Sequence, residues 1–232
     1  MTLKDEITTS VNNIFKSRWT TRKGNVVPQA DNVGLGNDAV LLTGTVLYAD
    51  LSGSTDMVDR WKPNFAAEIY KAYLDSTARV IRSEGGEIVA YDGDRVMAVF
   101  IGNSKNTSAV RCGLKINWAA KNIVMPLMKQ QYPTSNFTLQ HVVGIDTSDL
   151  LVARTGVRGA NDLVWVGCAA NYAAKLTELD AAYPTWITHR VFDNMDASLK
   201  KSCGGGSVWE PRAWTKMNKL SIYRSNSWMS FS

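Results

Sequence analysis

Two aspartates in this chain stand where carboxylates can meet at one edge of a sheet. Asp50 closes an apolar run from Ala39 to Leu51, and Asp94 follows Asp92-Gly93 between two β-prone runs. Carboxylates placed together could hold paired Mg²⁺ ions, which prefer hard oxygen ligands and usually share them with substrate phosphates. Taken singly, Asp50 is better explained as the cap of the next helix and Asp94 as a turn residue. Their combination favours a metal site.

A tight turn follows the first aspartate. Ser52-Gly53-Ser54-Thr55 breaks the apolar run and leads directly into a helix-like segment. Its backbone N–H groups and the positive helix end could receive a triphosphate, and Gly53 would allow close approach. An ordinary capped helix start remains the alternative explanation. The chain has no GxxxxGK[ST] motif, which disfavours a P-loop NTPase.

A third polar pair lies in an alanine-rich segment after Gly167. Asn171 and Lys175 are four residues apart, so a helix there places them on one face. They could orient a ribose and neutralise a developing phosphoryl charge. A polar stripe on a helix is the ordinary meaning of such a pair, and its assignment depends on further similarity.

The elements that must position these residues alternate between helices and strands. Periodicity and turn signals predict helices over 3–17, 63–83, 108–129, 168–176 and 189–195, and strands over 39–51, 87–100 (a hairpin around Asp-Gly), 137–145, 149–154, 163–166, 185–188, 206–209 and 220–223. Because tight hairpins require antiparallel neighbours, an α+β fold is favoured over a doubly wound sheet. Residues 1–38 are expected to form a helical arm and loop, and 39–232 a catalytic domain.

Composition limits the classes of protein further. The chain has 232 residues, 45% of them hydrophobic and 20% charged, which is enough for one substantial globular core. No apolar run is long enough to cross a bilayer and no signal peptide is evident, so we expect no membrane contact. The three cysteines, Cys112, Cys168 and Cys203, form no CxxC pair, which argues against disulfides or a zinc site and favours a reducing cytoplasm.

A net charge of +5 suits an anionic ligand such as a small polyphosphate. No nucleic-acid-binding motif accompanies this charge, so we expect no nucleic-acid partner. The two histidines, His141 in a β-run and His189 at a helix start, are expected to be structural.

Three blocks of this sequence resemble class III nucleotidyl cyclases. Residues 46–55, Val-Leu-Tyr-Ala-Asp-Leu-Ser-Gly-Ser-Thr, look like the family's first metal motif, and residues 85–94, Gly-Gly-Glu-Ile-Val-Ala-Tyr-Asp-Gly-Asp, look like the second. Residues 166–176 resemble the helix that carries a ribose-positioning Asn and, four residues later, a transition-state Arg. The blocks follow the family's order and spacing over about residues 40 to 180.

The resemblance implies a ferredoxin-like α+β catalytic domain with an antiparallel-dominated sheet, which forms a head-to-tail homodimer with composite active sites. It implies that two Mg²⁺ or Mn²⁺ ions bind at Asp50 and Asp94 with help from the Leu51 carbonyl. Ser52, Gly53, Ser54 and Thr55 would hold the phosphates of a nucleoside triphosphate, Asn171 the ribose, and Lys175 the transition state. Lys216, in a late hairpin, would contact the triphosphate.

Departures from the family pattern concern the base. The positions at which family members commonly read a purine carry Ala90 and Val164, and apolar side chains cannot hydrogen-bond a purine edge. Lys175 replaces the usual Arg, which keeps the charge but loses the planar fork. Tyr48, Arg95, Arg154 and Trp165 are candidates for contacts with the base or the phosphates.

With small apolar residues at the base-contacting positions and an intact metal motif, the chain resembles the bacterial pyrimidine cyclases of Pycsar-type antiphage systems. That likeness implies UTP as the favoured substrate, cUMP as the product, and a downstream effector that the product activates. A cytidylate cyclase making cCMP, an adenylate or guanylate cyclase with unusual purine contacts, and an inactive nucleotide-binding sensor remain alternatives.

Overall fold

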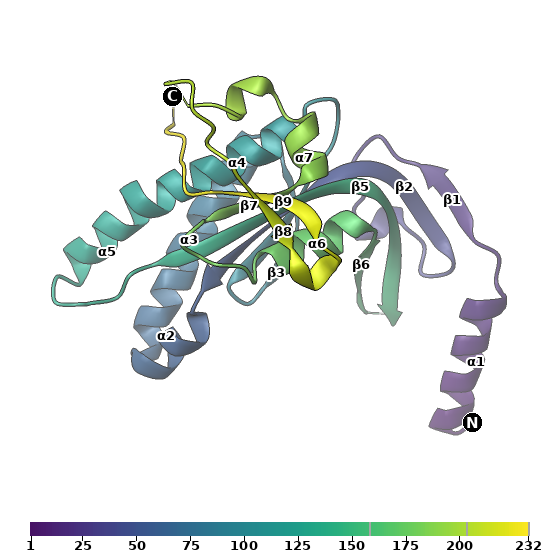
Figure 1. The fold of residues 1–232 in the computed structure, drawn as a ribbon. Helices are drawn as coiled ribbons and strands as arrows, with labels where there is room; N and C mark the ends of the chain where they lie inside the picture. Colours follow the sequence, from purple (N-terminus) through teal and green to yellow (C-terminus); the bar gives the residue numbers. More distant parts are fainter. Residues whose placement is uncertain (158, 203, 232) are drawn as a thin grey trace. The chain divides into compact units, whose positions relative to one another are not determined.

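A computed structural model describes residues 1–157, 159–202 and 204–231 (Figure 1). By their internal packing the residues form two units, Met1–Thr43 with Asp149–Gly167, and Gly44–Ser148 with Cys168–Ser232. None of the helices in the described part of the chain is long and apolar enough to span a membrane. Cys203 lies outside the described residues.

The smaller unit contains the N-terminal helix and two short strands, each of which pairs with one end of a longer strand. Its elements are α1 (Leu3–Lys16), β1 (Thr20–Lys23), a 3₁₀ turn (Ala30–Asn32), the beginning of β2 (Asp38–Ser52), the end of β5 (Gln140–Val157) and β6 (Ala160–Val166). β1 pairs in parallel with β2, and β6 pairs antiparallel with β5. The predicted N-terminal helix is confirmed, and a capping box between Thr2 and Asp5 explains where it begins.

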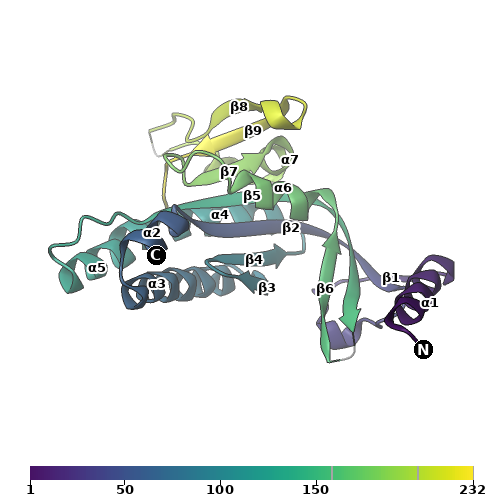
Figure 2. The same cartoon turned by 90° about the horizontal axis from the view of Figure 1, so that it is seen from below.

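The larger unit is a seven-stranded mixed sheet with the strand order β3-β4-β2-β5-β7-β9-β8. Its strands besides β2 and β5 are β3 (Glu87–Asp92), β4 (Arg95–Phe100), β7 (Thr185–Thr188), β8 (Glu210–Trp214) and β9 (Leu220–Ser225). The hairpins β3–β4 and β8–β9 form its two opposite edges (Figure 2). The β3–β4, β4–β2, β7–β9 and β9–β8 pairs are antiparallel, and β5 and β7 run parallel. The α+β prediction is therefore confirmed.

Helices cover both faces of this sheet. The helical elements are α2 (Ser54–Arg60), α3 (Pro63–Ser83), α4 (Lys105–Ala119), a π turn (Ala120–Val124), α5 (Met125–Gln131), α6 (Cys168–Leu176), α7 (His189–Asn194) and two 3₁₀ turns (Ala197–Leu199, Thr215–Met217). Helices α3, α4 and α7 share the main core with one face, while α6 packs on the other with Trp186 and Trp214 (Figure 1). Because β2 is covered on both faces, its central residues are almost continuously buried.

The predicted helix over 108–129 begins three residues earlier and is interrupted by the π turn. Pro126 follows that turn, and a proline ring inside a helix clashes with the carbonyl four residues before it. The wider π turn accommodates the proline without ending the helix.

The strands predicted over 137–145 and 149–154 are one continuous strand, β5, so the break between them is wrong. The sequence Asp146-Thr147-Ser148-Asp149 has the composition of a turn. In the fold, Asp146 is bound by Thr188 and Arg190, and the Thr147 hydroxyl contacts Thr45 and the Gly44 carbonyl. These tertiary hydrogen bonds allow the polar residues to remain in the strand.

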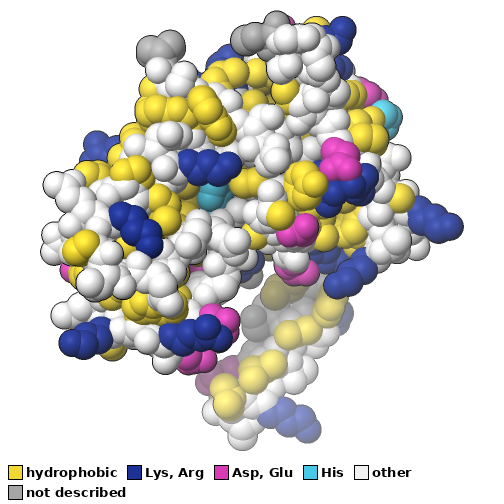
Figure 3. Space-filling view, turned by 60° about the vertical axis from the view of Figure 1, so that its left-hand side comes forward, with side chains coloured by type: hydrophobic (Ala, Val, Ile, Leu, Met, Phe, Trp, Pro, Cys, Tyr) yellow, Lys and Arg dark blue, Asp and Glu magenta, His cyan; other side chains and the backbone are white. Residues whose placement is uncertain are grey.

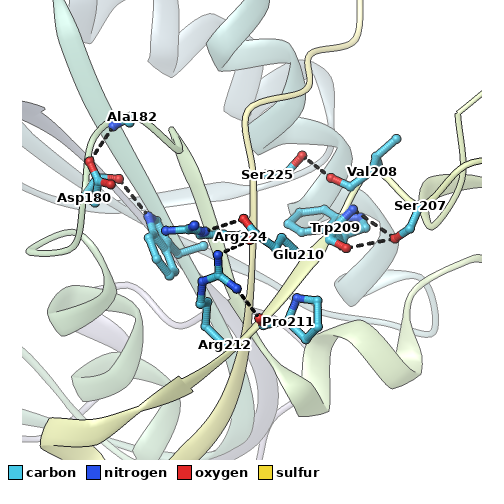
Figure 4. Close-up of polar contacts among 11 residues, drawn as sticks. Asp180, Ala182, Ser207, Val208, Trp209, Glu210, Pro211, Arg212, Arg224 and Ser225 are labelled. Carbon is cyan, nitrogen blue, oxygen red and sulfur yellow. Dashed lines mark hydrogen bonds and ion pairs between the residues drawn. The ribbon is translucent and has the colours of Figure 1, made fainter.

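The strand predicted over 206–209 is also wrong, because β8 begins at Glu210 (Figure 4). The Ser207 hydroxyl receives the Trp209 N–H at 3.2 Å and donates to the Trp209 carbonyl at 2.9 Å, which holds a local turn. The Trp209 indole is buried and donates to the Leu199 carbonyl. Apolar residues here anchor a loop instead of pairing in the sheet.

The β8–β9 edge is attached to the sheet by Arg224 (Figure 4). Its Nε donates to Glu210 Oε2 at 2.7 Å, and its guanidinium lies 3.6 Å from the centre of the Tyr183 ring. The ion pair and the cation–π contact fix the hairpin that carries Lys216.

Candidate functional site

The Asp50–Asp94 pair lies where β2 and β4 meet. Asp50 is paired with Arg95 in the antiparallel register of β2 and β4. Asp94 directly precedes Arg95 in the chain and lies in the β3–β4 hairpin turn. Gly93 forms that turn with φ of 60°, a conformation that glycine adopts without strain. The structure therefore brings the two predicted metal ligands together at one edge.

The electrostatics of this pair match a cation site. Burial, followed by the negative charge of Asp94, raises the pKa of Asp50 to about 6. Asp94 Oδ2 is buried and has no hydrogen-bond partner in the described part of the chain. Two neighbouring carboxylates, one with an unsatisfied oxygen, are the donor set that a divalent cation would neutralise.

The protein's own carboxylates do not complete a coordination sphere. Among the residues described, no cluster of three or more His, Cys, Asp or Glu side chains is arranged to hold a metal. The sequence-predicted third ligand is the main-chain carbonyl of Leu51, whose side chain is buried in the core. Substrate phosphates and water would have to supply the remaining oxygens, as Mg²⁺ sites commonly require.

Tyr48 and Arg95 lie beside the carboxylates. Tyr48 and Asp50 are two residues apart on β2 and share one face of the sheet. The Arg95 guanidinium lies 5.6 Å from the centre of the Tyr48 ring, and its Nη2 binds Asp92 at 2.6 Å. The charge of Arg95 partly offsets the rise in the pKa of Asp50. These two candidates are therefore placed next to the site.

The predicted phosphate turn lies at the end of β2. Gly53 has a φ of 73° and serves as the N-cap of α2, and it makes no side-chain capping hydrogen bond. Ser52 and Thr55 are exposed and Ser54 is half-buried. No side chain caps the start of α2, so its first-turn N–H groups are left available to an anion, while an ordinary helix start capped by glycine remains the alternative.

Asn171 and Lys175 lie four residues apart on α6, as predicted, and both are exposed. The opposite face of α6 packs against β5, where a Cβ on Gly144 would lie 2.1 Å from the Ala173 carbonyl oxygen. Gly144 thus sets how closely α6 approaches the sheet.

The late hairpin brings Lys216 into the neighbourhood of α6. The Lys175 ammonium is 4.0 Å from the Met217 sulfur, and the Tyr172 ring meets Trp214 edge-on at 6.0 Å. Lys216 is exposed in the turn between these two hairpin residues. Two lysines from distant parts of the sequence therefore lie on neighbouring elements.

The sequence interpretation missed a buried charge pair beneath α6. Asp146 is fully buried in β5, and its carboxylate accepts hydrogen bonds from Thr188 and from Arg190 Nη2, the latter at 2.6 Å. The Arg190 guanidinium lies 5.6 Å from the centre of the Tyr172 ring on α6. Nothing local marks Asp146 in the sequence, because its partners come from β7 and α7, some forty residues later.

The remaining base candidates are divided between the two units. Ala90 is half-buried in β3, at an irregularity in its pairing with β4. Val164 and Trp165 lie in β6, in the smaller unit, with Val164 39% exposed. Arg154, in the same unit, binds Asn161 at 2.7 Å and Asp31 at 3.2 Å. The base contacts remain predictions.

Comparison with known proteins gives close relatives. The chain is 55% identical to a uridylate cyclase of Xanthomonas perforans over 97% of both chains, and 50% identical to one of Burkholderia cepacia over 94% of both. It is 36% identical to a uridylate cyclase of a Rhodovulum species over 98% of both chains. No family model matches the chain.

Solved structures show the same fold. A bacterial light-regulated adenylyl cyclase superposes with a TM-score of 0.68 at 19% identity, covering 85% of this chain and 55% of that one. The guanylyl cyclase Cya2 superposes with a TM-score of 0.67 at 19% identity, covering 82% of this chain and 94% of that one. The larger similarity in sequence is thus to the uridylate cyclases.

Proposed function

Because the chain belongs to the uridylate cyclases, a group of class III nucleotidyl cyclases, we propose that it converts UTP to 3′,5′-cyclic UMP and pyrophosphate. The single observation that carries the site assignment is the pairing of Asp50 with Asp94, one with a raised pKa and the other with a buried, unpartnered oxygen. This pair supports an enzyme over a nucleotide-binding sensor, since a sensor has no need to keep two carboxylates so close.

Asp50, Asp94 and the Leu51 carbonyl would hold two Mg²⁺ or Mn²⁺ ions. When bound, the ions would lower the pKa of the ribose 3′-hydroxyl and screen the triphosphate. The two carboxylates determine where the metal ions would bind. Arg95, which forms an ion pair with Asp92, also offsets part of the negative charge on Asp50.

The other candidate residues position the substrate. The N–H groups of the turn Ser52 to Thr55 would bind phosphate oxygens, and Lys216 would contact the triphosphate. Asn171 would orient the ribose so that its 3′-oxygen faces the α-phosphorus. The 3′-oxygen would bond to the α-phosphorus as the bond from that phosphorus to the bridging β-phosphate oxygen breaks. The hydroxyl proton would pass to water, and pyrophosphate would leave. Lys175 would stabilise the charge that develops.

A homodimer would complete each site. The predicted arrangement is head to tail, with the carboxylates of one protomer facing α6 and Lys216 of its partner. Asn171 and Lys175 are exposed, which supports contact with a group outside their own helix. In the described part of the larger unit, no hydrogen bond or ion pair joins the Asp50–Asp94 pair to α6 of the same protomer.

The absence of polar side chains at two expected base-contacting positions supports a pyrimidine as the base of the substrate. Ala90 and Val164 offer no hydrogen bond to a purine, and Tyr48 occupies part of the face beside Asp50. CTP remains the nearest alternative substrate, because the apolar positions do not separate the two pyrimidines. As a cUMP synthase the protein would act in a Pycsar-type antiphage system, with an effector that the cyclic nucleotide activates.

Incubation with each of the four nucleoside triphosphates and Mn²⁺, followed by mass spectrometry of the products, tests the proposal. We expect cUMP as the dominant product. cCMP in excess would move the substrate to CTP, a cyclic purine would contradict the pyrimidine assignment, and no product from any triphosphate would favour the sensor.

A further inference from the structure

A hollow of about 380 Å³ lies on the helical side of the larger unit. It is formed by the end of α4, the π turn, the start of β5 and the loop before β7, and its walls include Asn117, Lys121, Leu139, His141, Ala182 and Pro184. A volume of this size is at the lower end of small-molecule sites.

The hollow is separate from the Asp50–Asp94 site. His141, Val143 and Ile145 are spaced two residues apart along β5 and so point to the same face, which is the face of the core shared with α3 and α4. Leu51 belongs to the same core, so its neighbour Asp50 faces the opposite side of the sheet. A ligand in the hollow would therefore lie on the other face from the substrate.

Two buried polar atoms at this hollow have no hydrogen-bond partner in the described part of the chain. They are His141 Nε2 and Asn117 Oδ1, on side chains that are 3% and 0% exposed. The Asn117 amide nitrogen donates to the carbonyls of Asn226 and Ser227, at 3.3 and 2.8 Å, which fixes the orientation of the amide and leaves its oxygen unused. Native proteins rarely leave such groups unpaired, because the lost hydration is costly.

The imidazole of His141 is neutral. Burial, followed by the positive charge of Lys121, lowers its pKa to about 3. A neutral imidazole can donate or accept one hydrogen bond at Nε2, according to its tautomer. The Tyr73 ring lies 5.6 Å from the imidazole centre.

Lys121 supplies a positive charge beside the buried groups. It is exposed on the π turn and takes part in no ion pair among the residues described. Figure 3 shows a histidine side chain at the bottom of a hollow with a basic side chain above it. The hollow thus combines a cation, a buried acceptor, a buried imidazole nitrogen and apolar walls.

These groups define the chemistry of an occupant. It needs an N–H or O–H donor for Asn117 Oδ1, a partner for His141 Nε2, a flat apolar body and an acidic group near Lys121. A uracil ring offers an N–H between two carbonyl oxygens, and its nucleotides carry a phosphate. We propose that this hollow is a second binding site, which takes uridine monophosphates, including the cyclic product. The choice of uridine rests on the proposed function, whereas the site itself does not.

Binding is tested with the active site occupied by 3′-deoxy-UTP and Mn²⁺, since this analogue lacks the attacking hydroxyl. cUMP and UMP are titrated while the histidine ¹⁵N–¹H correlations are recorded. The chain has two histidines, so His189 on α7 is an internal reference. We expect the His141 signals to shift and saturate while those of His189 stay in place. A His141 spectrum that is unchanged up to millimolar cUMP and UMP overturns the proposal.

Two variants locate the ligand, and calorimetry measures its affinity. His141→Phe and Lys121→Glu should each weaken cUMP binding by about tenfold or more. Lys129→Glu on α5, which does not line the hollow, is the matched control and should bind as the wild type does. Equal affinity in His141→Phe and wild type would contradict the site.

Separate arms identify which part of the nucleotide is recognised. Inorganic phosphate alone and uridine alone should each bind more weakly than UMP. If phosphate alone reproduces the UMP titration, the hollow holds an adventitious ion only and the proposal fails. Cyclase activity on UTP is measured in parallel, and it should persist in both variants, so loss of the hollow and failure of the proposed function give different results.

Discussion

Asp50 and Arg95 face each other across the β2–β4 pair, which leaves Asp94 alone in the turn beside them. Arg95 is occupied by Asp92 at 2.6 Å, so it does not neutralise both carboxylates. The pair therefore carries excess negative charge at a half-buried edge. This arrangement disfavours the folded protein unless a cation is present. Burial of Asp50, followed by the negative charge of Asp94, raises the pKa of Asp50 to about 6.

Replacement of one carboxylate should remove activity without unfolding the protein. We expect Asp94→Asn to lower cyclase turnover by at least about 100-fold, because the metal site would lose one of its two carboxylates. Its melting temperature should be equal to or above that of the wild type, since the repulsion with Asp50 disappears. Pyrophosphate release and circular dichroism measure the two effects. Asp75→Asn, an exposed aspartate on α3, is the control, and full activity in Asp94→Asn would rule out the assignment.

Metal should stabilise the protein even without nucleotide. A ligand that binds only the folded state at 100 times its dissociation constant adds about 2.7 kcal/mol of unfolding free energy. Mn²⁺ should therefore raise the melting temperature of the wild type and leave that of Asp94→Asn unchanged, and EDTA should reverse the shift. An equal shift in both proteins would mean that Mn²⁺ binds elsewhere.

Local sequence patterns were sufficient to predict the elements that carry the site. They failed where contacts between residues distant in sequence determine the structure. The β2 run, the Asp-Gly hairpin and the spacing of α6 predicted where Asp50, Asp94 and Asn171 lie, because each depends on neighbours in sequence. The polar residues that start at Asp146 were misread as a break, because their partners come from other strands. The unpaired nitrogen of His141 could not be predicted either, because it depends on how the core around it packs.

His141 should make stability depend on pH. Its folded pKa is about 3 and its unfolded value is near 6.5, so between these values the unfolded chain gains a proton that the folded protein does not. The stability is fully present above about pH 6.5 and is lost as the pH falls. Relative to His141→Phe, the wild type should lose about 2 kcal/mol between pH 7 and pH 5, measured by urea unfolding. Parallel pH profiles for the two proteins would show that the imidazole is not buried as described.

Gly144 should control the position of α6. A Cβ there would lie 2.1 Å from the Ala173 carbonyl oxygen, a backbone atom that cannot move without the helix. Gly144→Ala should destabilise the fold by about 1–3 kcal/mol and lower turnover more than it changes substrate affinity, because Asn171 and Lys175 move with the helix. The control is Gly36→Ala, where an added Cβ meets nothing within 4 Å. Wild-type activity in Gly144→Ala would mean that the placement of α6 is not critical.

Mixing two inactive variants should restore activity if the sites are shared between protomers. Asp50→Ala removes a carboxylate and Lys175→Ala removes the charge on α6, so each homodimer would lack one group in both of its sites. In a mixed dimer, one site would carry both defects and the other neither. Random exchange makes half of the dimers mixed, so we expect recovery of about a quarter of wild-type turnover. The measurement is cUMP formation after co-refolding the two proteins, with each variant refolded alone as the control. If each protomer contained a complete site of its own, every site in the mixture would keep one defect and no activity would return.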